Sequence, residues 1–267
     1  MSEPSPNVPP RRKSGASNRP VAKRPPRRRS GGGHGRTLLY GIAGGVVLVV
    51  VIVLVIVLSS NSSSPSRVNK SQEAINWKTP AGLQVYGGIG PEGIPVQVGP
   101  KLARANTGLT GATIGGVSCD SSEQTAFHHH IHLVIFINGT PRSVPIAIGF
   151  TPPAQVVQGN GGYFAEAPGG ANPCLYWLHV HAQDGIVHIE SPIVKTFVLG
   201  QVFAVWQQPL SSTQVGPYKG TVTATVNSVP WSGDPSSIPL DEHTQIVLNL
   251  GGPVVTPPPI SWSGSGL

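Results

Sequence analysis

The sequence predicts an α+β protein: a mostly antiparallel, β-rich domain with one packed helix, preceded by a single transmembrane helix. Three observations lead to this prediction. The 267 residues include 34 Gly and 28 Pro, and the segments between them are rich in Val, Ile and Thr, which favour strands. Several of these segments alternate apolar and polar residues, as half-buried strands do. Residues 38–58 carry no charge, and about 20 apolar residues suffice to span a membrane.

The first 36 residues are mostly Pro, Ser, Gly and Arg, so we expect a disordered cytoplasmic tail over 1–36. Ten of the 18 basic residues lie in this tail. After residue 58, eight basic residues stand against ten acidic ones, which gives that part a net charge of −2. The overall charge of +7 therefore belongs to the tail, and we expect no nucleic acid as a partner.

Residues 37–58 are interpreted as an uncleaved signal anchor, because the apolar run is too long for a cleavable signal peptide. The basic flank predicts a cytoplasmic N-terminus, a single pass through the cell membrane and an extracytoplasmic C-terminal part. Membrane lipid is then the expected partner of 37–58. Gly41 and Gly45 form a small-xxx-small pair that is compatible with a homodimer. Beyond the anchor we expect a flexible linker over 59–80, a β-rich domain over 81–255 and a Pro-rich tail over 256–267.

The first histidine-bearing strand is predicted before Asn138-Gly139, a hairpin signal that follows an apolar run. Because side chains alternate between the faces of a strand, three histidines share one face of it: His128, His130 and His132. After the returning strand, residues 151–173 are interpreted as a long loop rich in Gly and Pro, of the kind that is often functional or mobile.

A second hairpin is predicted over 174–190, where two alternating runs flank Asp184-Gly185. Both central residues of a type I′ turn need a positive φ, which makes Asp-Gly a strong hairpin signal. With these residues at the turn, Gln183 pairs with Ile186. A four-residue loop would keep the same faces, whereas a three-residue loop with a bulge would turn one strand over, so the assignment of faces depends on the turn.

The predicted turn gathers three histidines and a carboxylate on one face of this hairpin. His181 is then opposite His188, and His179 is opposite Glu190. Such pairs lie about 5 Å apart at Cβ, which is close enough for the side chains to share a metal ion. A polar outer face that binds nothing would have the same pattern, and the sequence does not show that the two histidine strands adjoin.

Cys119 and Cys174 are the only cysteines. Outside the cytoplasm an even number of cysteines favours a disulfide over two thiolate metal ligands. Such a bridge would hold the starts of the two histidine strands close together. Further along the chain, apolar spacing predicts a helix at about 199–207, and two more strands are expected at 220–227 and 244–250.

The region of about 119–252 resembles an uncharacterised family of bacterial membrane-anchored extracytoplasmic proteins. The likeness rests on His130-Ile-His132, on the block CLYWLHxHxxxGxxHIESP from Cys174 to Pro192, and on Val198 to Trp206. The chain departs from the family at Val198, where Thr is usual. Because the family has no assigned activity, the resemblance implies a location but no reaction.

Three classes of function remain open at the level of the sequence. The favoured one is a membrane-anchored domain that binds copper or zinc, because imidazole suits both metals; its ligands would come from His128, His130, His132, His179, His181, His188 and Glu190. The alternatives are a structural or interaction domain of the cell envelope without metal, and a zinc-dependent hydrolase with Glu190 as base or ligand. No nucleophile elbow, P-loop or dinucleotide fingerprint occurs, so an enzyme is not expected and no catalytic residue is assigned.

Overall fold

A computed structural model of the chain describes residues 80–166 and 174–267. These residues belong to a compact unit that extends over Pro65–Leu267. The expected basic tail, the expected signal anchor with Gly41 and Gly45, and nearly all of the expected linker lie outside the described residues.

The predicted α+β class with a transmembrane helix is wrong for the part that the structure describes. That part is mostly β-sheet, with 41% of its residues in strands and 6% in helix. Its α-helix, α2 (Leu199–Val205), forms where apolar spacing predicts it but has only seven residues. No described helix is long and apolar enough to cross a membrane.

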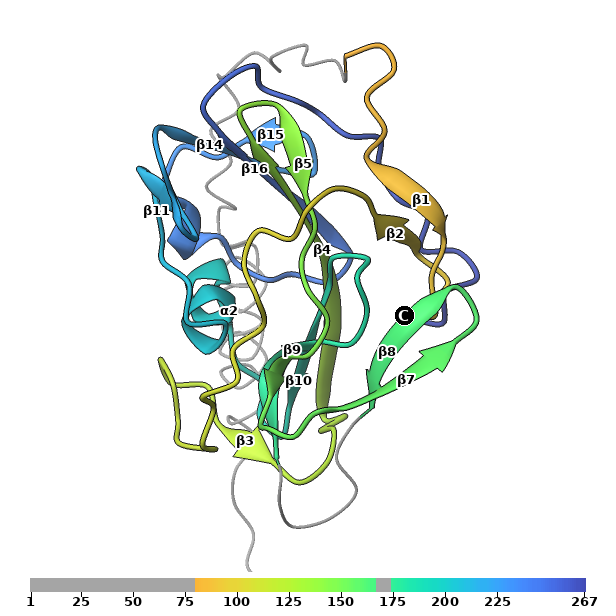
Figure 1. Cartoon of the computed structure of the whole chain (residues 1–267). Helices are drawn as coiled ribbons and strands as arrows, with labels where there is room; N and C mark the ends of the chain where they lie inside the picture. Colours follow the sequence, from red (N-terminus) through yellow and green to blue (C-terminus); the bar gives the residue numbers. More distant parts are fainter. Residues whose placement is uncertain (1–79, 167–173) are drawn as a thin grey trace, which may run out of the picture. The chain divides into compact units, whose positions relative to one another are not determined.

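A nine-stranded sheet forms the centre of the described unit, with the strand order β15-β14-β16-β4-β10-β9-β3, β5 paired to β4, and β6 paired to β9 (Figure 1). Its strands are β3 (Cys119–Asp120), β4 (Phe127–Ile137), β5 (Thr140–Arg142), β6 (Ile148–Phe150), β9 (Leu175–Val180), β10 (Ile186–Ser191), β14 (Val222–Val226), β15 (Val229–Pro230) and β16 (Thr244–Leu250). The pairing is antiparallel except between β16 and β4, which run parallel. The predicted strands at 220–227 and 244–250 are thus confirmed as β14 and β16.

Smaller elements surround this sheet. They are the pair β1 (Tyr86–Ile89) and β2 (Pro95–Gln97), the pair β7 (Gln155–Gly159) and β8 (Gly162–Glu166), the three short strands β11 (Leu210–Ser211), β12 (Gln214–Val215) and β13 (Tyr218–Lys219), and the 3-10 helix η1 (Pro235–Ser237). Helix α2 lies on one side of the central strands, and the β7–β8 hairpin lies on the other (Figure 1). The predicted loop over 151–173 therefore contains a hairpin, and 167–173 lie outside the described residues.

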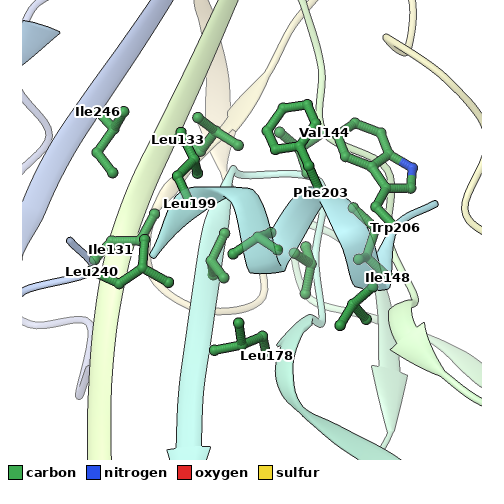
Figure 2. Packing of buried hydrophobic residues seen from close by; sticks show 14 of the residues in the cluster. Ile131, Leu133, Val144, Ile148, Leu178, Leu199, Phe203, Trp206, Leu240 and Ile246 are labelled. Atoms are coloured by element: carbon green, nitrogen blue, oxygen red, sulfur yellow. The ribbon is translucent and has the colours of Figure 1, made fainter. Parts of the chain in front are cut away.

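The two faces of the sheet differ in chemistry. On β4, Ile131 and Leu133 point into the main hydrophobic core, where they meet Leu199 and Phe203 of α2 (Figure 2). Full burial of one such side chain stabilises the fold by about 1.5–3 kcal/mol. The opposite face has a smaller apolar cluster at one end, which includes Val134. The remainder of that face carries histidines.

The turn at Asn138-Gly139 has the geometry that the sequence predicts. Both residues have a positive φ, 49° and 74°, and Ile137 pairs with Thr140 across the turn. These values are typical of a type I′ hairpin.

The second hairpin forms, but its predicted register is wrong. His188 pairs with His179 rather than with His181. Only Gly185 of the expected turn pair has a positive φ, 83°, while the Asp184 carboxylate accepts the backbone N–H of Ile186 at 3.0 Å. This side-chain contact closes a wider loop than a two-residue turn.

The predicted disulfide is confirmed: Cys119 is bonded to Cys174. Cys119 begins β3, which pairs with β9. The bridge thus fixes the edge of the sheet next to a histidine strand.

Candidate metal centre

Strand β10 lies between the two histidine-bearing strands and brings their side chains to one face. On one side it pairs with β4, so that His130 is opposite His188 and His128 is opposite Glu190. On the other side it pairs with β9, so that His179 is opposite His188. The structure therefore answers the question that the sequence leaves open, since both histidine strands adjoin β10.

Two overlapping groups of side chains are close enough to hold a metal ion, with the ligand atoms of each group within 4.8 Å of one another. One group is His128, His130, His188 and Glu190; the other is His179, His181, His188 and Glu190. All of these residues are buried except His128. Six of the seven predicted site residues thus lie together.

The seventh predicted ligand, His132, lies outside both groups. Its Nε2 is 3.0 Å from the carbonyl oxygen of Asp184, and its ring lies against that of Tyr86, with the centroids 5.7 Å apart. In the register of the sheet His132 is opposite Ile186, where β10 begins, so it lies beyond the histidines and Glu190. Burial lowers the pKa of His132 to about 4.

The rings of His179 and His181 lie nearly perpendicular, at an interplanar angle of 82°, with Nε2 to Nε2 at 3.0 Å. The Nδ1–H of His179 donates to the carbonyl of Tyr176 at 2.8 Å, and that of His181 donates to the carbonyl of Ala165 at 2.5 Å. A carbonyl oxygen only accepts, so Nδ1 carries the proton in both rings and both Nε2 atoms present lone pairs. Burial lowers the pKa of His179 well below its usual range and that of His181 to about 4.

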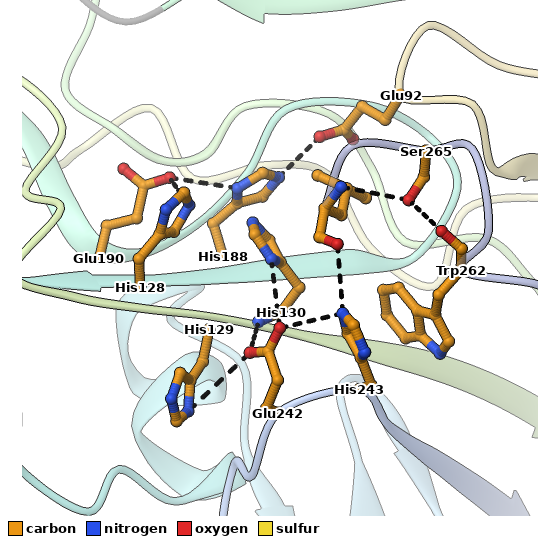
Figure 3. A network of polar contacts seen from close by, with 11 residues as sticks. Glu92, His128, His129, His130, His188, Glu190, Glu242, His243, Trp262 and Ser265 are labelled. Atoms are coloured by element: carbon orange, nitrogen blue, oxygen red, sulfur yellow. Dashed lines mark hydrogen bonds and ion pairs between the residues drawn. The ribbon is translucent and has the colours of Figure 1, made fainter.

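His188 is held between two carboxylates (Figure 3). Its Nε2 lies 2.6 Å from Glu92 Oε1, and its Nδ1 lies 3.3 Å from Glu190 Oε1. Burial alone would lower the pKa of His188, but the hydrogen bonds to Glu190 and Glu92 raise it to about 9. Sequence reasoning missed Glu92, which follows β1 in a Gly- and Pro-containing turn that has no periodic signal.

His128 and His130 approach the same cluster from β4. Nε2 of His128 lies 3.2 Å from Glu190 Oε1. His130 is buried with neither ring nitrogen hydrogen-bonded; its Nδ1 lies 3.9 Å from Glu242 Oε1. Burial lowers the pKa of His130 to about 3. A buried polar atom without a hydrogen-bond partner costs about 1–3 kcal/mol. A bound metal ion or a hydrogen-bond partner at these two nitrogens would remove that cost.

Glutamates surround these histidines. Every ion pair within 80–166 and 174–267 joins a histidine to a glutamate. Glu123, which the sequence reasoning also missed, lies 3.5 Å from Nε2 of His181 through Oε1. The β7–β8 hairpin closes the same side, with the Phe164 ring stacked on that of His181 at 4.6 Å.

The fold and the site together define a mostly-β domain with a buried cluster of histidine and glutamate on one face of its sheet. Comparison of the chain with protein-family models, with curated proteins and with solved structures finds no match. The resemblance noted from the sequence therefore stays a prediction.

Proposed function

We propose that the protein binds a transition-metal ion, copper or zinc, through His179, His181, His188 and Glu190. The observation that carries this proposal is the pair of Nε2 lone pairs 3.0 Å apart. Two lone pairs at that distance repel each other unless a cation lies beside both of them.

The spacing of the pair fits a shared ion. Nitrogens that bind one zinc at 2.0–2.1 Å, with an angle of 90–110° between the bonds, lie about 2.9–3.4 Å apart. Glu190 Oε2 lies 3.8 Å from Nε2 of His179 and has no hydrogen-bond partner, so a small movement would add it to the same ion.

The second ring nitrogens also support metal binding. Histidines that ligate metals usually donate their other N–H to a carbonyl or carboxylate, which fixes the tautomer and the ring orientation. His179 and His181 both do so, to the carbonyls of Tyr176 and Ala165. Three imidazoles and one carboxylate are donors that suit Zn²⁺ and Cu²⁺.

Burial favours a binding role over hydrolysis of a substrate. The His179 and Glu190 side chains are 0% and 4% exposed, whereas those of His128 and Glu123 are 40% and 43% exposed. The two most deeply buried of these ligands are therefore shielded from solvent. The Cys119–Cys174 disulfide supports a location in an oxidising compartment.

The test is the metal content of the full chain, made without a histidine tag and dialysed after exposure to Zn²⁺ or Cu²⁺. We expect at least one equivalent of metal, lost in His179→Ala/His181→Ala. His243→Ala is the matched control, because this histidine stacks on Trp262 and belongs to neither group. A wild-type chain without metal, or equal metal in both variants, contradicts the proposal.

A further inference from the structure

We infer that the cluster holds two divalent metal ions bridged by the carboxylate of Glu190. This inference rests on the proposed function and extends it from one ion to a pair. The other ligands divide between β4 on one side and β9 with the residue that follows it, His181, on the other, and Glu190 and His188 of β10 lie between them.

One ion cannot use all of the donors. The six side chains fall into two groups rather than one, each within 4.8 Å. Donors bound to one ion at 2.0–2.1 Å lie at most about 4.2 Å apart. A single ion beside His179 and His181 therefore leaves His128 and His130 without a role, although both ring nitrogens of the buried His130 lack a hydrogen bond.

The two oxygens of the Glu190 carboxylate point toward different histidines. Its Oε1 lies 3.2 Å from Nε2 of His128 and 3.3 Å from Nδ1 of His188. Its Oε2 is buried without a hydrogen-bond partner and lies 3.8 Å from Nε2 of His179. Two oxygens facing two donor sets are the arrangement of a bridging carboxylate.

The donors divide unevenly between the ions. His128, His130, Nδ1 of His188 after the metal has displaced its proton, and Oε1 of Glu190 give the first ion four protein ligands, which is the number in closed zinc sites. The second ion has three ligands, which are His179, His181 and Oε2 of Glu190. In this pair His188 serves the first ion, and a fourth position stays open on the second ion, on the side of Glu123.

The charge around the cluster fits two dications. Four glutamates each lie within 4.0 Å of a histidine nitrogen of the cluster: Glu92 at His188, Glu123 at His181, Glu190 at His128, and Glu242 at His130. Their four negative charges balance the four positive charges of two divalent ions. Glu92 and Glu190 are buried, at 5% and 4% exposed, whereas Glu123 and Glu242 are 43% and 38% exposed, so solvent also screens the charges of the latter two.

Native mass spectrometry of the full chain titrated with Zn²⁺ tests the number of ions. We expect two ions in the wild type, and one each in His128→Ala/His130→Ala and in His179→Ala/His181→Ala. One ion in the wild type, lost in His179→Ala/His181→Ala but kept in His128→Ala/His130→Ala, would overturn this inference and leave the proposed function intact. No ion at all would overturn both.

Electron paramagnetic resonance of the chain loaded with two equivalents of Cu²⁺ tests the bridge. Metal pairs in such sites lie about 3.5–4 Å apart, so we expect a half-field signal from coupled Cu²⁺ spins. Glu190→Gln, which keeps the shape of the side chain, is expected to remove that signal. A wild type that holds two Cu²⁺ ions and gives the full-intensity spectrum of two isolated Cu²⁺ spins would overturn the bridge.

Discussion

Gly185 fixes how the central hairpin meets its neighbours. Its φ is 83°, and its carbonyl accepts the backbone N–H of Leu133 at 2.8 Å. A Cβ at this position would collide with the Gln97 side chain and with the Leu133 carbonyl oxygen. The loop that carries His181 can therefore lie this close to β4 only with glycine at its end.

Gly185→Ala is accordingly expected to destabilise the protein by about 1–3 kcal/mol, the range for a residue held in an unfavourable backbone conformation. Urea denaturation followed by circular dichroism measures the change in the free energy of unfolding. Gly88→Ala in β1 is the matched control, because its Cβ would meet no atom within 4 Å. Equal free energies of unfolding for the two variants would show that the close approach at Gly185 does not contribute to stability.

At the residue scale, the sequence predicts which face of a strand a side chain occupies better than it predicts which residue lies opposite on the next strand. The actual register differs from the predicted one by two residues, and a shift of two keeps every side chain on its face. The predicted grouping of His179, His181, His188 and Glu190 on one face is therefore correct, although the predicted turn is wrong. The sequence could not predict that Glu92 belongs to the site, because Glu92 comes from a turn 96 residues away from His188.

The β7–β8 hairpin is the element that orients His181. The Ala165 carbonyl accepts the Nδ1–H of His181 at 2.5 Å, and the Phe164 ring stacks on the imidazole at an interplanar angle of 9°. This hairpin has only a weak signal in the sequence, because its strands are five residues long, β7 is mostly exposed, and glycines lie at the turn between the strands. Such strands lack the apolar alternation on which prediction depends.

Phe164→Ala is expected to weaken the binding of the ion at His181 by about 10–100-fold, the usual effect of losing a group that orients a ligand. The number of bound ions should stay unchanged. Competition against a chromophoric chelator gives the dissociation constant. Tyr163→Ala, the exposed neighbour in β8, is the control, and equal affinities of the two variants would contradict an orienting role for the hairpin.

For the molecule as a whole, the sequence predicts the β content and one short helix but not the layout of the sheet. The parallel pairing of β16 with β4 joins segments far apart in the chain, and strand order is set by packing of both faces rather than by local pattern. The predicted α+β class implies more helix than the described residues contain, because α2 ends after two turns, at Val205.

The buried histidines give the metal-free protein a defined pH window of stability. The pKa values of His130, His132 and His181 are lowered to about 3, 4 and 4, so their contribution is fully present above about pH 6.5, the unfolded value, and is lost as the pH falls toward 4. The pKa of His188 is raised to about 9; its contribution is present below about pH 6.5 and is lost as the pH rises through 9.

Thermal melts in the presence of a chelator, from pH 4 to pH 10, are therefore expected to show the highest Tm near pH 6.5, with a fall toward pH 4 and a smaller fall toward pH 9. His132→Gln removes one of the titrating groups. It should reduce the slope of the unfolding free energy near pH 5 by about 1.4 kcal/mol per pH unit, the value for one proton. An unchanged slope would show that His132 does not titrate in this range.

The pairing of β4 also sets a time for the assembly of the site. The backbone N–H of His130 donates to Glu242, which is 112 residues further along the chain, and β16 follows directly. At about 5–20 residues per second of synthesis, this partner appears about 6–22 s after His130. Until then one edge of the histidine strand has no neighbour, so the surroundings of His128 and His130 are complete only after β16 has been made.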